Sequence, residues 1–338
     1  MLIFLRKTAI FVQIPCHTMR RTLIFTLIAT LCLLSCSKKT HIQISGFAQG
    51  GTYTVKCSVA GNANAVGNEL KAGIDSILAV IDRSVSGYNP GSLLSRYNEG
   101  IEITDDASAE YCVFKELSDY CDSLYTATGG VLDTRAAELF DIWGFGFKEG
   151  RMPADDEVRR VLANRRKMNF NAVAQGYSAD AVASYLRGKG VEDMMVNIGG
   201  EIFCCGLNPA GKGWALGIDE PDDGNMSPGR NMKCTFTVPP GQSCGIVTSG
   251  NYRKFYIEDG VKYSHTVDPR TGYPVRHNLL SATVIAPTAA LADALATYCM
   301  VIGMEEASAF IAGRPDLEAC LISSDTVWHS EGLDISER

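Results

Sequence analysis

Apolar residues recur at helical spacing in several segments of the chain. Between residues 70 and 82, leucine and isoleucine follow one another at intervals of three and four, so they share one face of a predicted helix. Helices are also predicted at residues 111–128, 174–186 and 288–302. Gly129 follows the first of these three and Gly303 the last, and glycine commonly ends a helix.

Alternating and β-branched runs predict strands between these helices. Residues 47–59 alternate after Gly50-Gly51, and residues 194–206 are interpreted as two short strands around Gly199-Gly200. Further strands are predicted at residues 233–238, 244–248, 252–257, 261–267 and 280–286. Because strands often follow one another directly, an α+β fold is favoured over a doubly wound sheet. We expect a single domain at 47–338, with mixed, largely antiparallel sheets and packed helices.

The first 35 residues resemble a bacterial lipoprotein signal peptide. Arg20 and Arg21 precede an apolar run at 23–34, which leads into Cys36. A basic start, a short apolar core and small residues at the cut describe a secretory signal. We therefore expect 1–35 to be removed and Cys36 to carry acyl chains that hold the protein on a bacterial membrane, facing the periplasm. An ordinary cleaved signal with a chance cysteine is the alternative.

The leader has a second possible start and is followed by a polar segment. Residues 1–18 have an apolar stretch of their own, so Met19 is a better-formed start than Met1. Residues 36–46 are mostly polar, which predicts a lipid-anchored tether that runs into the first strand.

The charge of the chain excludes one class of partner. The first 35 residues hold four of the 31 basic residues and none of the 38 acidic ones, which leaves the rest with a net charge of −11. Nucleic-acid binding requires a basic surface, so no nucleic-acid partner is expected. A phosphate-bearing ligand would need a metal ion or backbone N–H groups to meet its charge.

Asp293 and Thr297 form the clearest candidate metal site. They lie four residues apart in the predicted helix at 288–302, and thus on one face of it. A carboxylate and a hydroxyl are hard oxygen ligands that suit Mg²⁺ or Ca²⁺. The alternative is an unrelated acid next to a threonine that bonds its own helix backbone.

The segment DPRTG, residues 268–272, predicts a tight turn. It brings His265, Asp268 and Arg270 close together. A histidine titrates near neutral pH, so His265 is a candidate general base. In the alternative, the turn is structural, with Asp268 capping it and Arg270 on the surface.

The segment 169–180, NFNAVAQGYSAD, is a weaker candidate for phosphate binding. Gly176 permits close approach of a ligand, and a helix that starts near 172–174 would offer backbone N–H groups. No established phosphate-loop pattern is present, so simple packing is the alternative.

The order of motifs along the chain resembles the FAD:protein FMN transferase (ApbE-like) family over residues 46–305. The motifs are GTYTVK, SGYNPGSLLSRYN, ATGGVLD, LFDIWGFG, AVAQGYSAD, VNIGGEI, VTSGNY, YSHTVDPRTGYPV and VIAPTAALADALAT. The resemblance implies a single catalytic domain with two lobes and the flavin site between them. It also implies that FAD is the substrate and Mg²⁺ the cofactor.

The resemblance assigns roles to individual residues. It implies that Mg²⁺ is held by Asp293, Thr297 and the backbone carbonyl of Ala172, and that His265 is the catalytic base. The implied flavin contacts are Gln49, Tyr88, Val131, Leu132, Asp133, Asn169, Gln175 and the backbone of Val267.

The implied reaction moves the FMN moiety of FAD to a serine or threonine hydroxyl and releases AMP. The implied acceptors are flavin-acceptor subunits of membrane redox complexes. Asn169 and Gln175 stand where relatives often have charged residues, and Arg135 stands where a threonine is usual. Two alternatives therefore stay open: hydrolysis of FAD to FMN and AMP at the same site, or flavin binding without catalysis.

Overall fold

The computed structural model describes residues 39–337, apart from residues 105, 147–151, 224, 226–228, 253–254 and 259. The predicted signal peptide, the alternative start at Met19 and the acylation site Cys36 lie outside the described residues.

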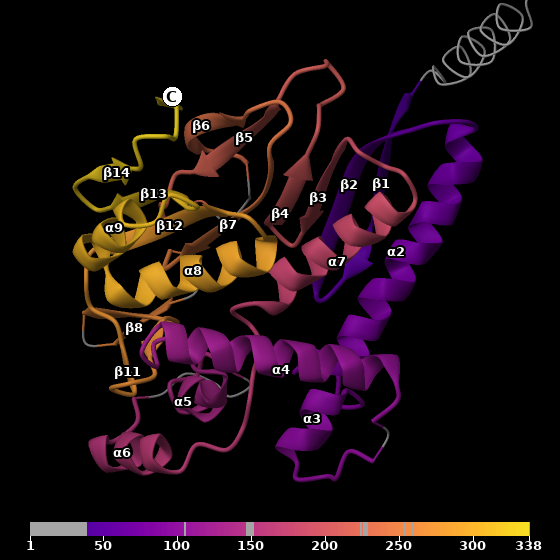
Figure 1. Ribbon diagram of the computed structural model, residues 1–338. Coiled ribbons are helices and arrows are strands. Elements are labelled where there is room, and N and C mark those ends of the chain that lie inside the picture. Colours follow the sequence, from indigo (N-terminus) through magenta and orange to yellow (C-terminus); the bar gives the residue numbers. More distant parts are fainter. Residues whose placement is uncertain are drawn as a thin grey trace, which may run out of the picture.

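An eight-stranded sheet forms the centre of the fold (Figure 1). Each strand is antiparallel to its neighbour. In spatial order the strands are β1 (Thr40–Ala48), β2 (Gly51–Val59), β3 (Met194–Ile198), β4 (Glu201–Cys205), β7 (Ser243–Gly250), β12 (Leu279–Ala286), β13 (Glu318–Ser323) and β14 (Val327–His329).

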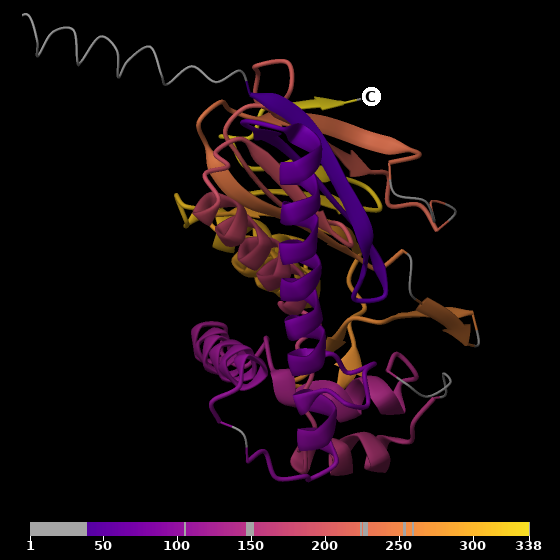
Figure 2. The same cartoon turned by 90° about the vertical axis from the view of Figure 1, so that its right-hand side faces the viewer.

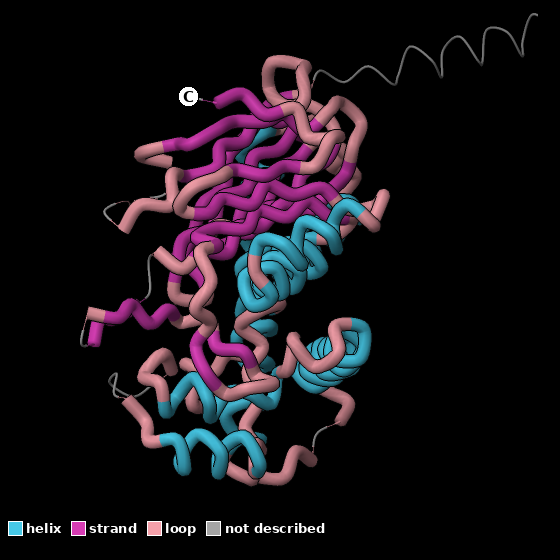
Figure 3. Tube along the Cα trace, turned by 90° about the vertical axis from the view of Figure 1, so that its left-hand side faces the viewer, coloured by secondary structure: helices cyan, strands magenta, loops and turns pink. Residues whose placement is uncertain are grey.

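Helices cover one face of this sheet (Figures 2 and 3). They are α2 (Ala63–Val85), α7 (Ala174–Gly188), α8 (Ala289–Ile302) and α9 (Met304–Ala312). Leu70, Ile74 and Leu78 of α2 are at most 2% exposed and pack against β2, β3 and α7. The apolar spacing in the sequence therefore marks the face that α2 buries.

A small sheet covers the other face. Its order is β15 (Ile335–Glu337), β6 (Met232–Val238) and β5 (Trp214–Asp219). Successive side chains of a strand point to opposite faces. In β7, Val247 packs on the helix side, whereas Ile246 packs with Trp214 and Phe236 of the small sheet.

A second, mainly helical lobe lies below the sheet in Figure 1. It contains α3 (Leu93–Asn98), α4 (Ala109–Ala127), the 3₁₀ helix η1 (Thr134–Ala136), α5 (Ala137–Ile142) and α6 (Asp155–Ala163). Beside it are the hairpins β8 (Phe255–Glu258) with β9 (Val261–Ser264), and β10 (Val267–Asp268) with β11 (Tyr273–Pro274). The end of α2 joins the lobes, because Ile81 and Val85 pack against Leu94 and Leu117. Within the described residues, none of the helices has the length and apolar character needed to cross a bilayer.

The α+β prediction with largely antiparallel sheets is confirmed, but two predictions near the start of the domain are wrong. The segment 47–59 is not one strand, because β1 ends at Ala48 and β2 begins at Gly51. Gln49 makes the turn with a φ of 53°, a conformation that non-glycine residues rarely adopt. The tether expected at 36–46 is shorter than predicted, because Thr40 already begins β1.

The structure also differs from two other strand predictions. The strand predicted at 252–257 begins at Phe255, and the strand predicted at 261–267 divides into β9 and β10. His265 lies in the break between them. A residue in such a break is not bound by the alternation of a strand, so its side chain can turn toward the space between the lobes.

Candidate active site

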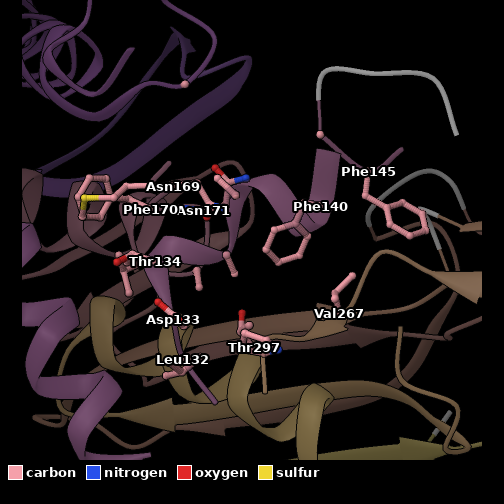
Figure 4. A pocket seen from close by; sticks show the side chains of 18 of the residues that line it. Leu132, Asp133, Thr134, Phe140, Phe145, Asn169, Phe170, Asn171, Val267 and Thr297 are labelled. Carbon is pink, nitrogen blue, oxygen red and sulfur yellow. Dashed lines mark hydrogen bonds between the residues drawn. The ribbon is translucent and has the colours of Figure 1, made fainter. Parts of the chain in front are cut away.

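A cavity of about 530 Å³ lies between the two lobes (Figure 4). On one side it is lined by α4 and by the segments around residues 131–146 and 167–173. On the other side it is lined by the end of β7, the segment around His265 and α8. Its volume lies within the range of small-molecule sites, roughly 300–1,000 Å³.

The structure brings most of the predicted site residues to this cavity. Those that line it are Tyr88, Val131, Leu132, Asp133, Asn169, Ala172, His265, Val267 and Thr297. Figure 4 shows Thr297 reaching from α8 into the space bounded by Leu132, Phe140 and Val267. Gln49, Gln175 and Asp293 are not part of the lining.

Asp133 is held in place by two neighbours. Its side chain accepts a 2.8 Å hydrogen bond from the backbone N–H of Arg135, which caps η1. It also pairs with Arg165 at 2.6 Å. Arg165 donates in addition to the Pro269 carbonyl at 3.1 Å, so this ion pair connects the DPRTG turn to the opposite wall of the cavity.

Residues 168 and 169 are held by hydrogen bonds from two sides. Asn98 donates to the Met168 carbonyl and accepts from the Met168 N–H, both at 2.8 Å. The Asn169 N–H donates to the Thr134 carbonyl at 2.9 Å. These bonds hold Asn169 against Thr134 in the cavity wall.

Asp293 is buried between the start of α7 and α8. It is 4% exposed and accepts a 3.1 Å hydrogen bond from the Gly176 N–H. A Cβ at Gly176 would stand 2.3 Å from the Ala289 carbonyl oxygen and 2.8 Å from Asp293 Cβ. Only glycine allows α7 to approach α8 this closely. The predicted role of Gly176 in close approach therefore concerns helix packing here.

The start of α8 is held by a second acid. Asp180 accepts hydrogen bonds of 2.8 Å from the N–H groups of Ala289 and Ala290. These are N–H groups that the helix itself leaves without partners. Together with the Thr288 cap, this contact fixes the rotation of α8 and so the positions of Asp293 and Thr297.

Two carboxyl groups in this region have raised pKa values. Burial first, and then the nearby Glu201 and Asp180 carboxylates, raise the pKa of Asp293 well above its usual value. Burial raises the pKa of Glu201 to about 7. Glu201 was missed as a site residue by sequence reasoning, although it lies in the VNIGGEI motif.

The donors around Asp293 fit a hard divalent cation. Asp293 and Thr297 are one helical turn apart, and Thr297 and Ala172 both line the cavity. Within the described residues, the Ala172 carbonyl accepts no backbone hydrogen bond, because the Gly176 N–H turns to Asp293. A carboxylate, a hydroxyl and a carbonyl oxygen are suitable ligands for Mg²⁺. No group of three or more His, Cys, Asp or Glu side chains in the described ranges could hold a metal ion.

His265 is half-buried at the cavity. Its ring lies 6.4 Å from that of Phe145 in an edge-on arrangement. Asp268 and Arg270 instead have the structural role named as the alternative, since Arg270 Nη2 pairs with Asp268 at 2.8 Å. The turn is anchored by Trp143, whose indole N–H donates to the Gly272 carbonyl at 2.8 Å.

Gln49 and Gln175 make their contacts outside the cavity lining. Gln49 Nε2 donates to Ser178 Oγ at 2.6 Å, and its Oε1 is buried without a hydrogen-bond partner. Gln175 Nε2 packs against Gly199. Direct flavin contact by either side chain therefore stays a prediction.

The fold and cavity define a two-lobed α+β protein with a small-molecule site between its lobes, and known proteins share this arrangement. The structure superposes with a TM-score of 0.69 on "Flavin Transferase ApbE from Vibrio cholerae", which is 29% identical, over 87% of this chain and 98% of that one. For the apo form of the Pseudomonas stutzeri flavinyl transferase ApbE, the TM-score is 0.72 at 26% identity, over 87% and 95%.

Sequence comparison agrees. FAD:protein FMN transferase of Haemophilus influenzae is 30% identical, over 86% of this chain and 89% of its own length. The protein of the same name from Vibrio cholerae is 32% identical, over 86% and 90%. The ApbE family model matches residues 49–321. The chain belongs to the ApbE family, as its motifs predicted.

Proposed function

We propose that this protein is an FAD:protein FMN transferase, which moves the FMN moiety of FAD to a serine or threonine hydroxyl of an acceptor protein and releases AMP. The observation that carries the proposal is the cavity between the lobes, where Thr297, Ala172 and His265 all reach one space. The names of the relatives from Haemophilus influenzae and Vibrio cholerae support it.

The residues around the cavity have distinct roles in this reaction. Asp293, Thr297 and the Ala172 carbonyl would hold a Mg²⁺ ion, which neutralises pyrophosphate charge when bound. Tyr88, Asn169 and the segment Val131–Asp133 contact the flavin nucleotide. The clamps on Asn169 and Asp133 keep this surface in place, so little rearrangement is needed on binding.

His265 acts as the proton acceptor. The acceptor hydroxyl oxygen attacks the phosphorus on the FMN side of the pyrophosphate and forms a new P–O ester bond. The bond from that phosphorus to the bridging oxygen breaks, and AMP leaves with the oxygen. The hydroxyl proton passes to His265, whose place at the edge of the cavity lets it meet a protein substrate that comes from solvent.

The membrane attachment is a separate proposal. Acyl chains on Cys36 would hold the protein on a bacterial membrane, facing the periplasm, where subunits of membrane redox complexes are the acceptors. Only three residues separate Cys36 from β1 at Thr40. An extended chain spans at most about 3.6 Å per residue, so the folded body would stay close to the lipid surface. Incorporation of labelled palmitate that is lost in a Cys36→Ala variant tests this attachment.

One experiment tests the reaction. The purified full chain is incubated with FAD, MgCl₂ and a flavin-acceptor domain, and both flavin fluorescence in denaturing gels and free AMP are measured. Labelled acceptor together with AMP supports transfer. Release of AMP without labelling supports FAD hydrolysis instead. Tight FAD binding without either product identifies a flavin-binding protein that does not catalyse.

A further inference from the structure

Glu201 and Asp293 carry neighbouring carboxyl groups, and neither residue is part of the cavity lining. Asp293 is 4% exposed. Glu201 Oε2 is inaccessible to solvent and has no hydrogen-bond partner. Burial first, and then the Glu201 carboxylate, raise the pKa of Asp293, and among the described residues no lysine or arginine pairs with either group.

The first turn of α7 connects the two acids. The Gly176 N–H donates to Asp293 Oδ2 at 3.1 Å. A Cβ added to Gly199 would stand 2.2 Å from Gln175 Nε2 and 3.3 Å from Glu201 Oε2. The Gln175 amide and the Glu201 carboxylate therefore both lie next to Gly199. Residues 175–176 thus contact Asp293 directly and share the neighbour Gly199 with Glu201.

Among the described residues, no positive side chain balances the negative charges of Glu201 and Asp293. A buried carboxylate without a partner is costly, and two neighbouring ones repel each other. A divalent cation would balance both charges at once. The cation site inferred at Asp293, Thr297 and Ala172 has only one acid of its own, so Glu201 supplies the second negative charge.

We propose that Glu201 is a second acidic residue of the divalent-cation site, and that its charge and that of Asp293 together hold the ion. Glu201 comes from β4, whereas Asp293 and Thr297 come from α8, so the ion would also join the central sheet to the helix. The assignment rests on the cation site of the proposed function, but it does not depend on which group is transferred.

Direct cation binding tests this assignment. MgCl₂ is titrated calorimetrically into the full chain, with and without FAD and in the absence of acceptor. Glu201→Gln should raise the dissociation constant about ten- to hundredfold, as expected when a supporting group of a metal site is removed. Glu192→Gln is the matched control. This variant removes the same charge, but from a side chain that is 79% exposed. An unchanged dissociation constant for Glu201→Gln would overturn the proposal.

Thermal unfolding separates this role from a structural one. In EDTA, Glu201→Gln should melt at a higher temperature than the wild type, because one of two repelling carboxylates is gone. In saturating MgCl₂ the wild type should gain more in melting temperature than the variant. A variant that melts lower in both solutions and gains as much from Mg²⁺ as the wild type would show that Glu201 is only structural.

Measurements of Mg²⁺ binding and of flavin transfer together separate a failure of the Glu201 assignment from a failure of the proposed function. In one case the wild type binds Mg²⁺ and Glu201→Gln does not, but the wild type transfers no flavin to the acceptor. The proposed function then fails while this assignment stands. If flavin is transferred and Mg²⁺ affinity is the same in both chains, the proposed function stands and this assignment fails.

Discussion

The Gly176 N–H donates a 3.1 Å hydrogen bond to Asp293 Oδ2 across the contact between α7 and α8. In a regular helix this N–H would donate to the carbonyl four residues earlier, that of Ala172. One bond therefore orients the buried acid and also leaves the Ala172 carbonyl without a backbone partner in the part of the chain that the structure describes. Both groups thus have an oxygen available to a metal ion, although only Ala172 lines the cavity.

Replacing Gly176 by alanine should destabilise the protein. The new Cβ would stand 2.3 Å from the Ala289 carbonyl oxygen, so α7 and α8 must move apart, at a cost of about 1–3 kcal/mol. Urea unfolding measures the change. Gly188→Ala in the same helix is the control, since nothing lies within 4 Å of its added Cβ. Equal stability of the two variants would show that the contact is not needed.

Asp293→Ala should abolish Mg²⁺-dependent flavin transfer. Removal of the only carboxylate among the predicted ligands leaves a hydroxyl and a carbonyl, which are weak ligands for Mg²⁺ on their own. Transfer rates are measured across a MgCl₂ titration, and Asp119→Ala on the exposed surface of α4 is the control. A variant with wild-type rates at each Mg²⁺ concentration would remove Asp293 from the metal site.

The sequence predicted the parts of this site that depend on local spacing. Asp293 and Thr297 share a helical face because they are four residues apart, and the structure places Thr297 at the cavity. The spacing did not reveal that Asp293 lies outside the cavity lining and accepts a hydrogen bond from Gly176. That orientation depends on the packing of α7 against α8, which joins residues more than a hundred positions apart.

Long-range contacts explain the other gaps in the prediction. Glu201 alternates as an ordinary strand residue, and its burial beside Asp293 depends on the position of α8 over β4. The pairing of Arg165 with Asp133 likewise joins segments that only tertiary folding brings together. The hairpin at Gln49 was missed for a local reason, because glutamine rarely takes a positive φ.

His277 should make the protein less stable in mild acid. Its Nε2 bonds the Met300 carbonyl at 2.9 Å, and its Nδ1 accepts from the Leu279 N–H at 3.3 Å. The bond to Nδ1 requires the neutral ring, because a protonated Nδ1 cannot accept, and burial lowers the pKa of His277 below 6.5 in the folded chain. The unfolded chain therefore binds this proton first, so stability falls as the pH drops through 6.5 toward the folded value.

Urea unfolding between pH 7.5 and 5.5 measures this contribution of His277. One proton contributes at most about 1.4 kcal/mol per pH unit. His277→Gln should flatten the pH dependence, whereas His329→Gln at an exposed position should leave it as in the wild type. An identical slope in the wild type and His277→Gln would exclude this histidine as the source.

His265→Ala should slow flavin transfer but leave FAD binding intact. The ring lines the cavity beside Phe145, and a missing general base typically costs about 10²- to 10⁴-fold in rate. FAD affinity is measured by quenching of flavin fluorescence, and transfer by labelling of the acceptor. His329→Ala serves as the control. If His265→Ala loses affinity and rate to the same extent, the residue shapes the site and does not accept the proton. A proton acceptor should lose rate alone. This loss should become smaller when the acceptor reaction is run at higher pH, because hydroxide then removes the hydroxyl proton.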